Sequence, residues 1–192
     1  MPGIVESMGF LDRWRKPKKK PISKAAMDTI ISDLQAKEEA RKASRPEVTL
    51  SGGEKLYFEK GGGDGGSWSS DKPVFSDAEG RQWSLMIDVD REGDHPSADQ
   101  HARLSEVRDH LTELLAQFAK RLPDECLEFD PETTDSPATF EELSGWTLWF
   151  EAPSTYEDYE WQITCEVEEP DGSISYAARF VGHELVGIRP TY

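Results

Sequence analysis

The sequence predicts an α+β domain in which an antiparallel sheet of four to six strands packs on one long amphipathic helix. Three observations lead to this prediction. Apolar and polar residues alternate along residues 83–89, 161–167 and 174–180, as in strands with one buried face. Apolar residues also recur with helical spacing along residues 98–122. Because the strands and the helix each have an apolar side to bury, two layers that cover one another are expected.

The clearest signal is a β-hairpin between residues 160 and 180. Four alternate apolar residues precede the turn at residues 169–172 and four follow it, and Gly172 suits the backbone geometry of a turn. If Glu168 faces Ser173, each apolar residue meets another one: Val167 meets Ile174, Cys165 meets Tyr176, Ile163 meets Ala178 and Trp161 meets Phe180. The stretch 146–192 therefore predicts three or four consecutive antiparallel strands.

The long helix has a start signal and a stop signal. Ser97 followed by Gln100 predicts a capping box, and Pro123 predicts the end of the helix. Between them lies one apolar stripe, formed by Leu104, Val107, Leu111, Leu114, Leu115, Phe118 and Leu122. After the helix, a short strand is expected at residues 126–130.

Three segments precede the domain, which is expected at residues 72–192. Residues 1–21 predict a disordered basic tail, because Pro17 and Pro21 oppose a helix there. Residues 22–44 predict an accessory helix capped by Ser23, and the glycine-rich residues 45–71 favour a linker or flexible loop with a strand near 55–59. The accessory helix has a short apolar stripe, formed by Met27, Ile30, Ile31 and Leu34.

Charge is distributed unevenly along the chain. Residues 1–45 contain 11 Lys or Arg and 6 Asp or Glu, a net charge of +5, whereas residues 46–192 contain 11 and 32, a net charge of −21. The acidic part is expected to attract a basic protein partner by long-range steering, or simply to keep the domain in solution. Contact with nucleic acid or an anionic membrane is expected only through the tail, at Arg13, Arg15, Lys16, Lys18, Lys19 and Lys20.

Aromatic and acidic residues between residues 149 and 160 suit the recognition of a basic protein surface. Trp149 is expected on the outer face of its strand, because Trp146, Leu148 and Phe150 occupy the apolar positions. The predicted partner-binding residues are Trp149, Tyr156, Glu157, Asp158, Tyr159 and Glu160. The alternatives are burial of Trp149 under the accessory helix or the glycine-rich loop, and a solvated hairpin loop.

The loop at residues 88–99 is a candidate for calcium or magnesium binding. Asp88, Asp90, Glu92 and Asp94 alternate along it as ligands do in calcium loops, but Pro96 departs from that pattern. The alternative is an acidic surface loop that leads into the helix, so that no cofactor is bound. The chain has no signature of nucleophilic, zinc or phosphate-loop chemistry, and we do not expect an enzyme.

The function predicted from the sequence is that of a small acidic intracellular binding module that docks or neutralises a basic protein, as an immunity or antitoxin-like inhibitor does. Two alternatives stay open: a metal-binding module or metal-dependent enzyme using the 88–99 loop, and an adaptor whose basic tail holds an anionic surface. A cytoplasmic location is expected, because the chain lacks a secretory leader and a spanning apolar run, and its two cysteines have no CxxC spacing. The sequence does not determine the oligomeric state.

Overall fold

The computed structural model describes residues 23–61, 64–129, 139–155, 158–169 and 172–191. The chain forms two compact units, residues 1–44 and residues 45–192. The basic tail predicted at residues 1–21 lies outside the described residues. None of the described helices combines the length and apolar character that a membrane-spanning helix requires.

The first unit contains the predicted accessory helix, α1 (Lys24–Ala43). Its start is confirmed, because the Ser23 hydroxyl accepts a hydrogen bond from the Ala26 amide at 3.3 Å. No residue of α1 is buried. The four residues of its apolar stripe are between 44% and 59% exposed.

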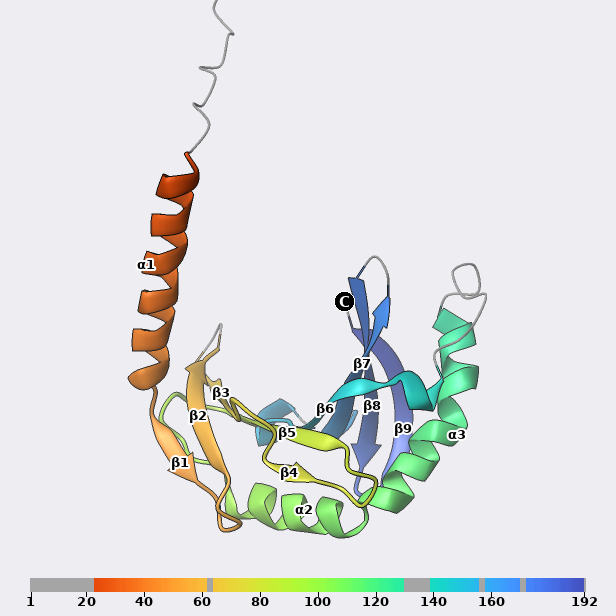
Figure 1. Ribbon diagram of the computed structural model, residues 1–192. Helices are drawn as coiled ribbons and strands as arrows, with labels where there is room; N and C mark the ends of the chain where they lie inside the picture. The colour runs from red at the N-terminus through yellow and green to blue at the C-terminus, as the bar shows by residue number, and fades with distance from the viewer. Residues whose placement is uncertain (1–22, 62–63, 130–138, 156–157, 170–171, 192) are drawn as a thin grey trace, which may run out of the picture. The chain divides into compact units, whose positions relative to one another are not determined.

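The second unit contains the sheet and two further α-helices (Figure 1). Its elements are β1 (Glu47–Thr49), β2 (Lys55–Lys60), β3 (Gly66–Ser69), β4 (Phe75–Ser76), β5 (Gln82–Val89), α2 (Ala98–Asp109), α3 (Leu111–Phe129), β6 (Ser144–Phe150), β7 (Trp161–Glu169), β8 (Gly172–Val181) and β9 (Glu184–Thr191). Two short 3₁₀ helices, η2 (Phe140–Glu142) and η3 (Pro153–Thr155), flank β6. The α+β class is therefore confirmed.

The sheet is larger than predicted and is mixed. The described residues contribute nine strands, in the order β1-β2-β3-β5-β6-β7-β8-β9, with β4 also beside β5. The prediction of four to six strands and of a purely antiparallel sheet is wrong, because β5 and β6 pair in parallel. The helical connection between them explains this pairing, since a parallel pair needs a long crossover whereas antiparallel neighbours need only a turn.

The predicted hairpin register is confirmed in β7 and β8. Trp161 lies opposite Phe180, Cys165 opposite Tyr176, and Glu168 opposite Ser173. Antiparallel pairing continues on both sides, from β6 to β7 and from β8 to β9. Three or four consecutive antiparallel strands were expected at residues 146–192, and the structure has four there, β6 to β9.

The predicted single helix is divided into two. The capping box of Ser97 and Gln100 starts α2 as expected, but α2 ends at Asp109 and α3 begins at Leu111. Figure 1 shows that the two helices meet at an angle, which lets both follow the twisted sheet. Pro123 lies inside α3 and does not end it, and residues 126–129 are helical instead of forming the predicted strand. The ion pair between Arg121 and Glu125 spans the proline.

The glycine-rich segment at residues 45–71 is more ordered than the predicted linker, because it contributes β1, β2 and β3. Its glycines permit close packing. A Cβ atom on Gly66 would lie 2.5 Å from the Phe58 ring, and one on Gly65 would lie 2.4 Å from the Val89 carbonyl oxygen. Trp68 of β3 is buried and donates its indole N–H to the Asp94 carbonyl at 2.8 Å. This strand was not predicted, because it has only four residues, follows a run of glycines and contains one large apolar residue, Trp68.

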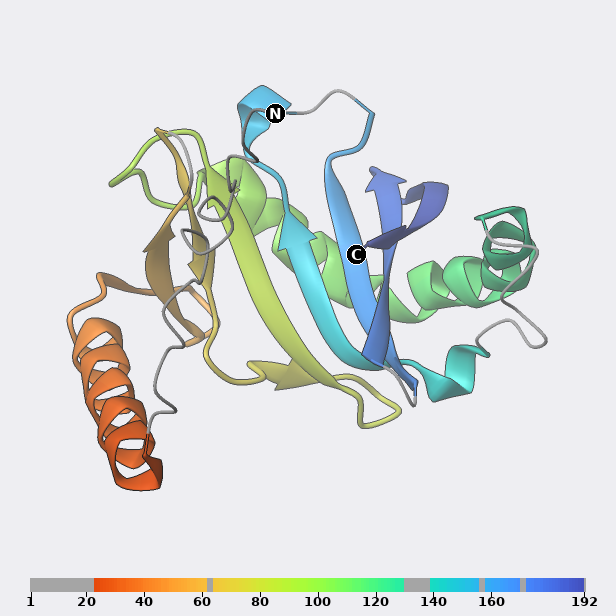
Figure 2. The same ribbon diagram turned by 90° about the horizontal axis from the view of Figure 1, so that it is seen from above.

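The helices α2 and α3 cover one face of the sheet, and the apolar core lies between these layers. Figure 2 shows the opposite face, on which none of the described α-helices of this unit lies. We call it the open face. The helix α3 also supports the edge strand β9: Arg121 donates to the Leu185 carbonyl at 2.7 Å, and Gln117 accepts from the Leu185 amide at 3.2 Å.

Gln100 joins the two parallel strands to the start of α2. Its side chain is 3% exposed. The amide nitrogen donates to the carbonyl oxygens of Asp88 at 2.9 Å and Glu151 at 3.1 Å, and the amide oxygen accepts from the Ser97 backbone at 2.9 Å. One buried side chain therefore fixes the carboxyl ends of β5 and β6.

We expect the substitution Gln100→Leu to lower the free energy of unfolding by about 2–3 kcal/mol, because it leaves buried carbonyl groups without a donor. Urea denaturation measures this change. Gln82→Leu is the control: Gln82 is exposed, so a change within about 0.5 kcal/mol is expected. Equal effects of the two substitutions would show that Gln100 does not hold the strand ends together.

Candidate functional site

The candidate site lies where the parallel strands β5 and β6 end, on the open face. Ile87 and Phe150 are paired neighbours that face the core, so the next residues, Asp88 and Glu151, both face the open side. The carboxyl ends of adjacent parallel strands are a common location for binding sites in sheets with helical crossovers. Here this location holds two carboxyl groups from residues that are distant in the sequence.

Asp88 is held by two hydrogen bonds on the open face. Its Oδ1 accepts from the Ser67 hydroxyl at 2.5 Å, and its Oδ2 accepts from the Trp149 indole at 2.9 Å. Asp88 and Trp149 are both half-buried. These contacts hold the Asp88 carboxylate beside the Trp149 indole N–H.

Glu151 occupies a less favourable environment for a charge. Its carboxylate accepts from the Tyr159 hydroxyl at 2.9 Å and from the Gln162 amide at 3.4 Å. Burial raises the pKa of Glu151, and the charge of Asp88 acts in the same direction, whereas the hydrogen bond from Tyr159 and the charge of Arg179 oppose it. Burial and the hydrogen bond to Glu151 likewise raise the pKa of Tyr159.

Two polar groups beside Glu151 are buried and have no hydrogen-bond partner among the residues that the structure describes. They are Oε1 of Gln162 and Nε of Arg179. These residues lie opposite one another across β7 and β8, and Trp149 lies opposite Gln162 on the other side. The Arg179 guanidinium lies over the Tyr159 ring at 4.4 Å from its centroid. We call these six residues the open-face cluster: Asp88, Trp149, Glu151, Tyr159, Gln162 and Arg179.

The structure brings together only some of the predicted partner-binding residues. Trp149 and Tyr159 belong to the cluster, and Asp158 is exposed beside Tyr159. Glu160 instead forms an ion pair with Arg103 of α2 at 2.9 Å, beside a small pocket on the helical side of the sheet. Tyr156 and Glu157 lie outside the described residues.

The sequence did not predict that Asp88, Glu151, Gln162 and Arg179 lie beside Trp149 and Tyr159. A usable signal existed for two of them. The predicted hairpin register already places Gln162 opposite Arg179 on the polar face. The other contacts depend on the parallel pairing of β5 with β6. That pairing was not predicted.

The four predicted metal ligands of the 88–99 loop have separate partners. Asp88 contacts Trp149, Glu92 pairs with Lys60 at 2.6 Å, and Asp90 accepts from the Ser154 amide at 3.3 Å. The Asp94 carbonyl oxygen is bound by Trp68. In the ranges that the structure describes, no group of three or more His, Cys, Asp or Glu side chains is arranged to hold a metal ion. Calcium or magnesium binding stays a prediction.

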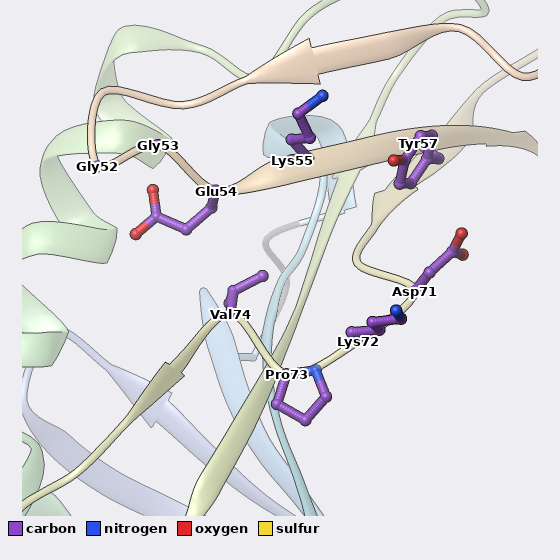
Figure 3. A pocket seen from close by; sticks show the side chains of 9 residues that line it. All are labelled: Gly52, Gly53, Glu54, Lys55, Tyr57, Asp71, Lys72, Pro73 and Val74. Atoms are coloured by element: carbon purple, nitrogen blue, oxygen red, sulfur yellow. The ribbon is translucent and has the colours of Figure 1, made fainter.

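A separate pocket of about 550 Å³ lies beside β2, between the β1–β2 turn and residues 71–74 (Figure 3). Its lining combines opposite charges, with Lys55 and Lys72 near Glu54 and Asp71. Glu54 is buried at one end of the pocket and forms an ion pair with Arg108 of α2. The Arg108 guanidinium also lies over the Phe75 ring at 4.2 Å from its centroid.

Comparisons with protein-family models, with curated proteins and with solved structures found no match.

The Glu54–Arg108 pair predicts a loss of stability in acid. Burial acts to raise the pKa of Glu54, but hydrogen bonds from Arg108 and from backbone amides, together with the Arg108 charge, lower it below the ordinary range. The stabilisation is therefore fully present above the unfolded-state pKa of about 4.3, and it is lost as pH falls through the lower folded-state pKa. We expect Glu54→Gln to remove this part of the pH dependence and to cost about 1.5–3 kcal/mol near pH 7.

Denaturation in urea across this pH range measures both effects. Glu47→Gln is the control, because Glu47 forms an exposed ion pair with Lys55. A loss of no more than about 1 kcal/mol is expected there. Glu54 would not be a stabilising buried charge if both variants behaved alike.

Glu151 predicts the opposite pH dependence. Its raised pKa means that the folded protein binds more protons than the unfolded chain between the unfolded-state pKa, about 4.3, and the folded-state pKa. Stability therefore falls as pH rises through this window. We expect Glu151→Gln to be more stable than the wild type at pH 7, and the gain to disappear when both are measured at a pH near 4.

Thermal or urea denaturation at the two pH values tests this expectation, with the exposed residue Asp124 of α3 changed to Asn as the control for loss of one negative charge. A Glu151→Gln protein less stable than the wild type at pH 7 would contradict it. Such a result would mean that the contacts with Tyr159 and Gln162 need the ionised carboxylate.

Proposed function

We propose that the protein is an acidic binding module whose open face docks a basic protein partner. The observation that carries the proposal is the open-face cluster, in which two carboxyl groups and two aromatic side chains lie together. They lie on the face of the sheet that none of the described α-helices of this unit covers. Carboxylates attract a basic surface, and tryptophan and tyrosine supply contact area at a small cost in side-chain entropy.

The charge balance of the second unit supports this proposal. This unit, residues 45–192, contains 12 Lys or Arg and 32 Asp or Glu, a net charge of −20. Many of the cations of this unit already form internal ion pairs: Arg45, Lys55, Lys60, Arg81, Arg103, Arg108 and Arg121. Each of these cations neutralises an acid within the unit, so the remaining negative charges are not balanced internally. Their field attracts a positively charged partner and speeds its association.

In its most concrete form, the proposal is inhibition of a basic enzyme such as a nuclease, in the manner of an immunity or antitoxin-like protein. Such an inhibitor blocks a surface that itself binds a polyanion, so an acidic face with aromatic anchors suits the task. The basic tail and the 88–99 loop stay separate predictions, for an anionic surface and for a metal ion.

We test the proposal with a positive charge placed on each side of the domain. Thr147 of β6 is half-buried on the open face, between Ser84 and Thr164, so a lysine there has small neighbours. Thr112 of α3 is exposed and provides the same chemical change in the helical layer. The full chain, immobilised, captures proteins from its native host at low salt, and a salt gradient releases them.

We expect a basic protein to bind the wild type and Thr112→Lys alike. It should bind Thr147→Lys at least about tenfold more weakly, because like charges oppose docking. Its release at raised salt would reflect screening. Equal capture by the two lysine variants would place the interface elsewhere, and capture of no basic protein by the wild type would contradict the proposal.

A further inference from the structure

Building on the proposed function, we propose that the open-face cluster binds one cationic side chain of the partner, and an arginine in preference to a lysine. The first reason is the charge of the cluster. With both carboxyl groups ionised, Asp88 and Glu151 carry two negative charges and Arg179 carries one positive charge. One further cation makes the half-buried cluster neutral, and this relieves the unfavourable environment of the Glu151 carboxylate.

The second reason is an acceptor that the fold leaves unused. Gln162 is 4% exposed, and its amide nitrogen donates to Glu151, which places the side chain within the cluster. Its Oε1 atom is buried and accepts no hydrogen bond from any described residue. A buried acceptor without a donor is unfavourable in the free protein, and a bound ligand that supplies an N–H group removes this cost. The ligand is therefore expected to be a hydrogen-bond donor as well as a cation.

The third reason favours a guanidinium over an ammonium group. Arg179 already shows that an aromatic ring of the cluster accepts a guanidinium over its face, since it lies over Tyr159. Trp149 offers a second ring beside the Asp88 carboxylate. A planar guanidinium can stack on a ring and donate to two acceptors in fixed directions at the same time, whereas an ammonium group is a compact charge with a stronger hydration shell.

The test uses three short peptides that differ only in one central residue: arginine, lysine, or citrulline, the neutral analogue of arginine. They are titrated at pH 7 into the full-length, ¹⁵N-labelled protein, up to about 20 mM, so that even a millimolar Kd is measured. The reporters are the Trp149 indole and the Gln162 side-chain amide. We expect the arginine peptide to shift both signals and to bind at least about threefold more tightly than the lysine peptide. The citrulline peptide should bind at least about tenfold more weakly than the arginine peptide, because it lacks the charge.

Glu151→Gln is the matched variant, because it removes one charge and keeps the shape of the side chain. We expect it to weaken binding of the arginine peptide by at least about fivefold, while Asp124→Asn on α3 leaves it unchanged. The proposal is overturned if citrulline binds as well as arginine, if Glu151→Gln has no effect, if lysine binds as tightly as arginine, or if the arginine peptide shifts neither reporter.

Failure of the arginine-site proposal can be distinguished from failure of the proposed function. If a captured basic protein is sensitive to Thr147→Lys but insensitive to Glu151→Gln, then the open face docks the partner without an arginine anchor. If the arginine peptide binds the cluster but no basic protein is captured, then the cation site stands and its ligand is not a basic protein of the native host.

Discussion

The parallel pairing of β5 with β6 is the constraint on which the rest of the second unit depends. It requires the helical crossover formed by α2 and α3, and this crossover supplies the apolar layer that buries one face of the sheet. Gln100 secures the pairing where the two strands end. Because the helices occupy one face only, the polar side chains of the central strands gather on the other face.

Two acids of this unit, Glu54 and Glu151, illustrate two different uses of a carboxylate. Glu54 receives hydrogen bonds from Arg108 and from the backbone, so the fold stabilises its charged form. The groups that stabilise the charge of Glu151 do not offset the effect of its burial, so the fold disfavours its charged form. A carboxylate of the first kind contributes to folding. One of the second kind is expected where binding of a cation offsets the cost of burial.

The structure also explains why sequence reasoning found the strands more readily than the site. The alternation in β7 and β8 is local, and it fixed the register because each apolar residue needs an apolar partner. Glycines at positions 65 and 66 concealed β3, although they are the residues that permit its close packing. Pro123 indicated a helix end, but helical hydrogen bonding continues beyond it.

The sequence by itself determined the α+β class, the caps of α1 and α2, the hairpin register and the acidic character of the domain, because each of these depends on neighbouring residues or on composition. Only the tertiary structure decided the parallel pairing, the division of the long helix and the membership of the open-face cluster. That cluster draws on four strands and a loop, from Asp88 to Arg179. Its geometry arises from the order of strands in the sheet, which no local pattern specifies.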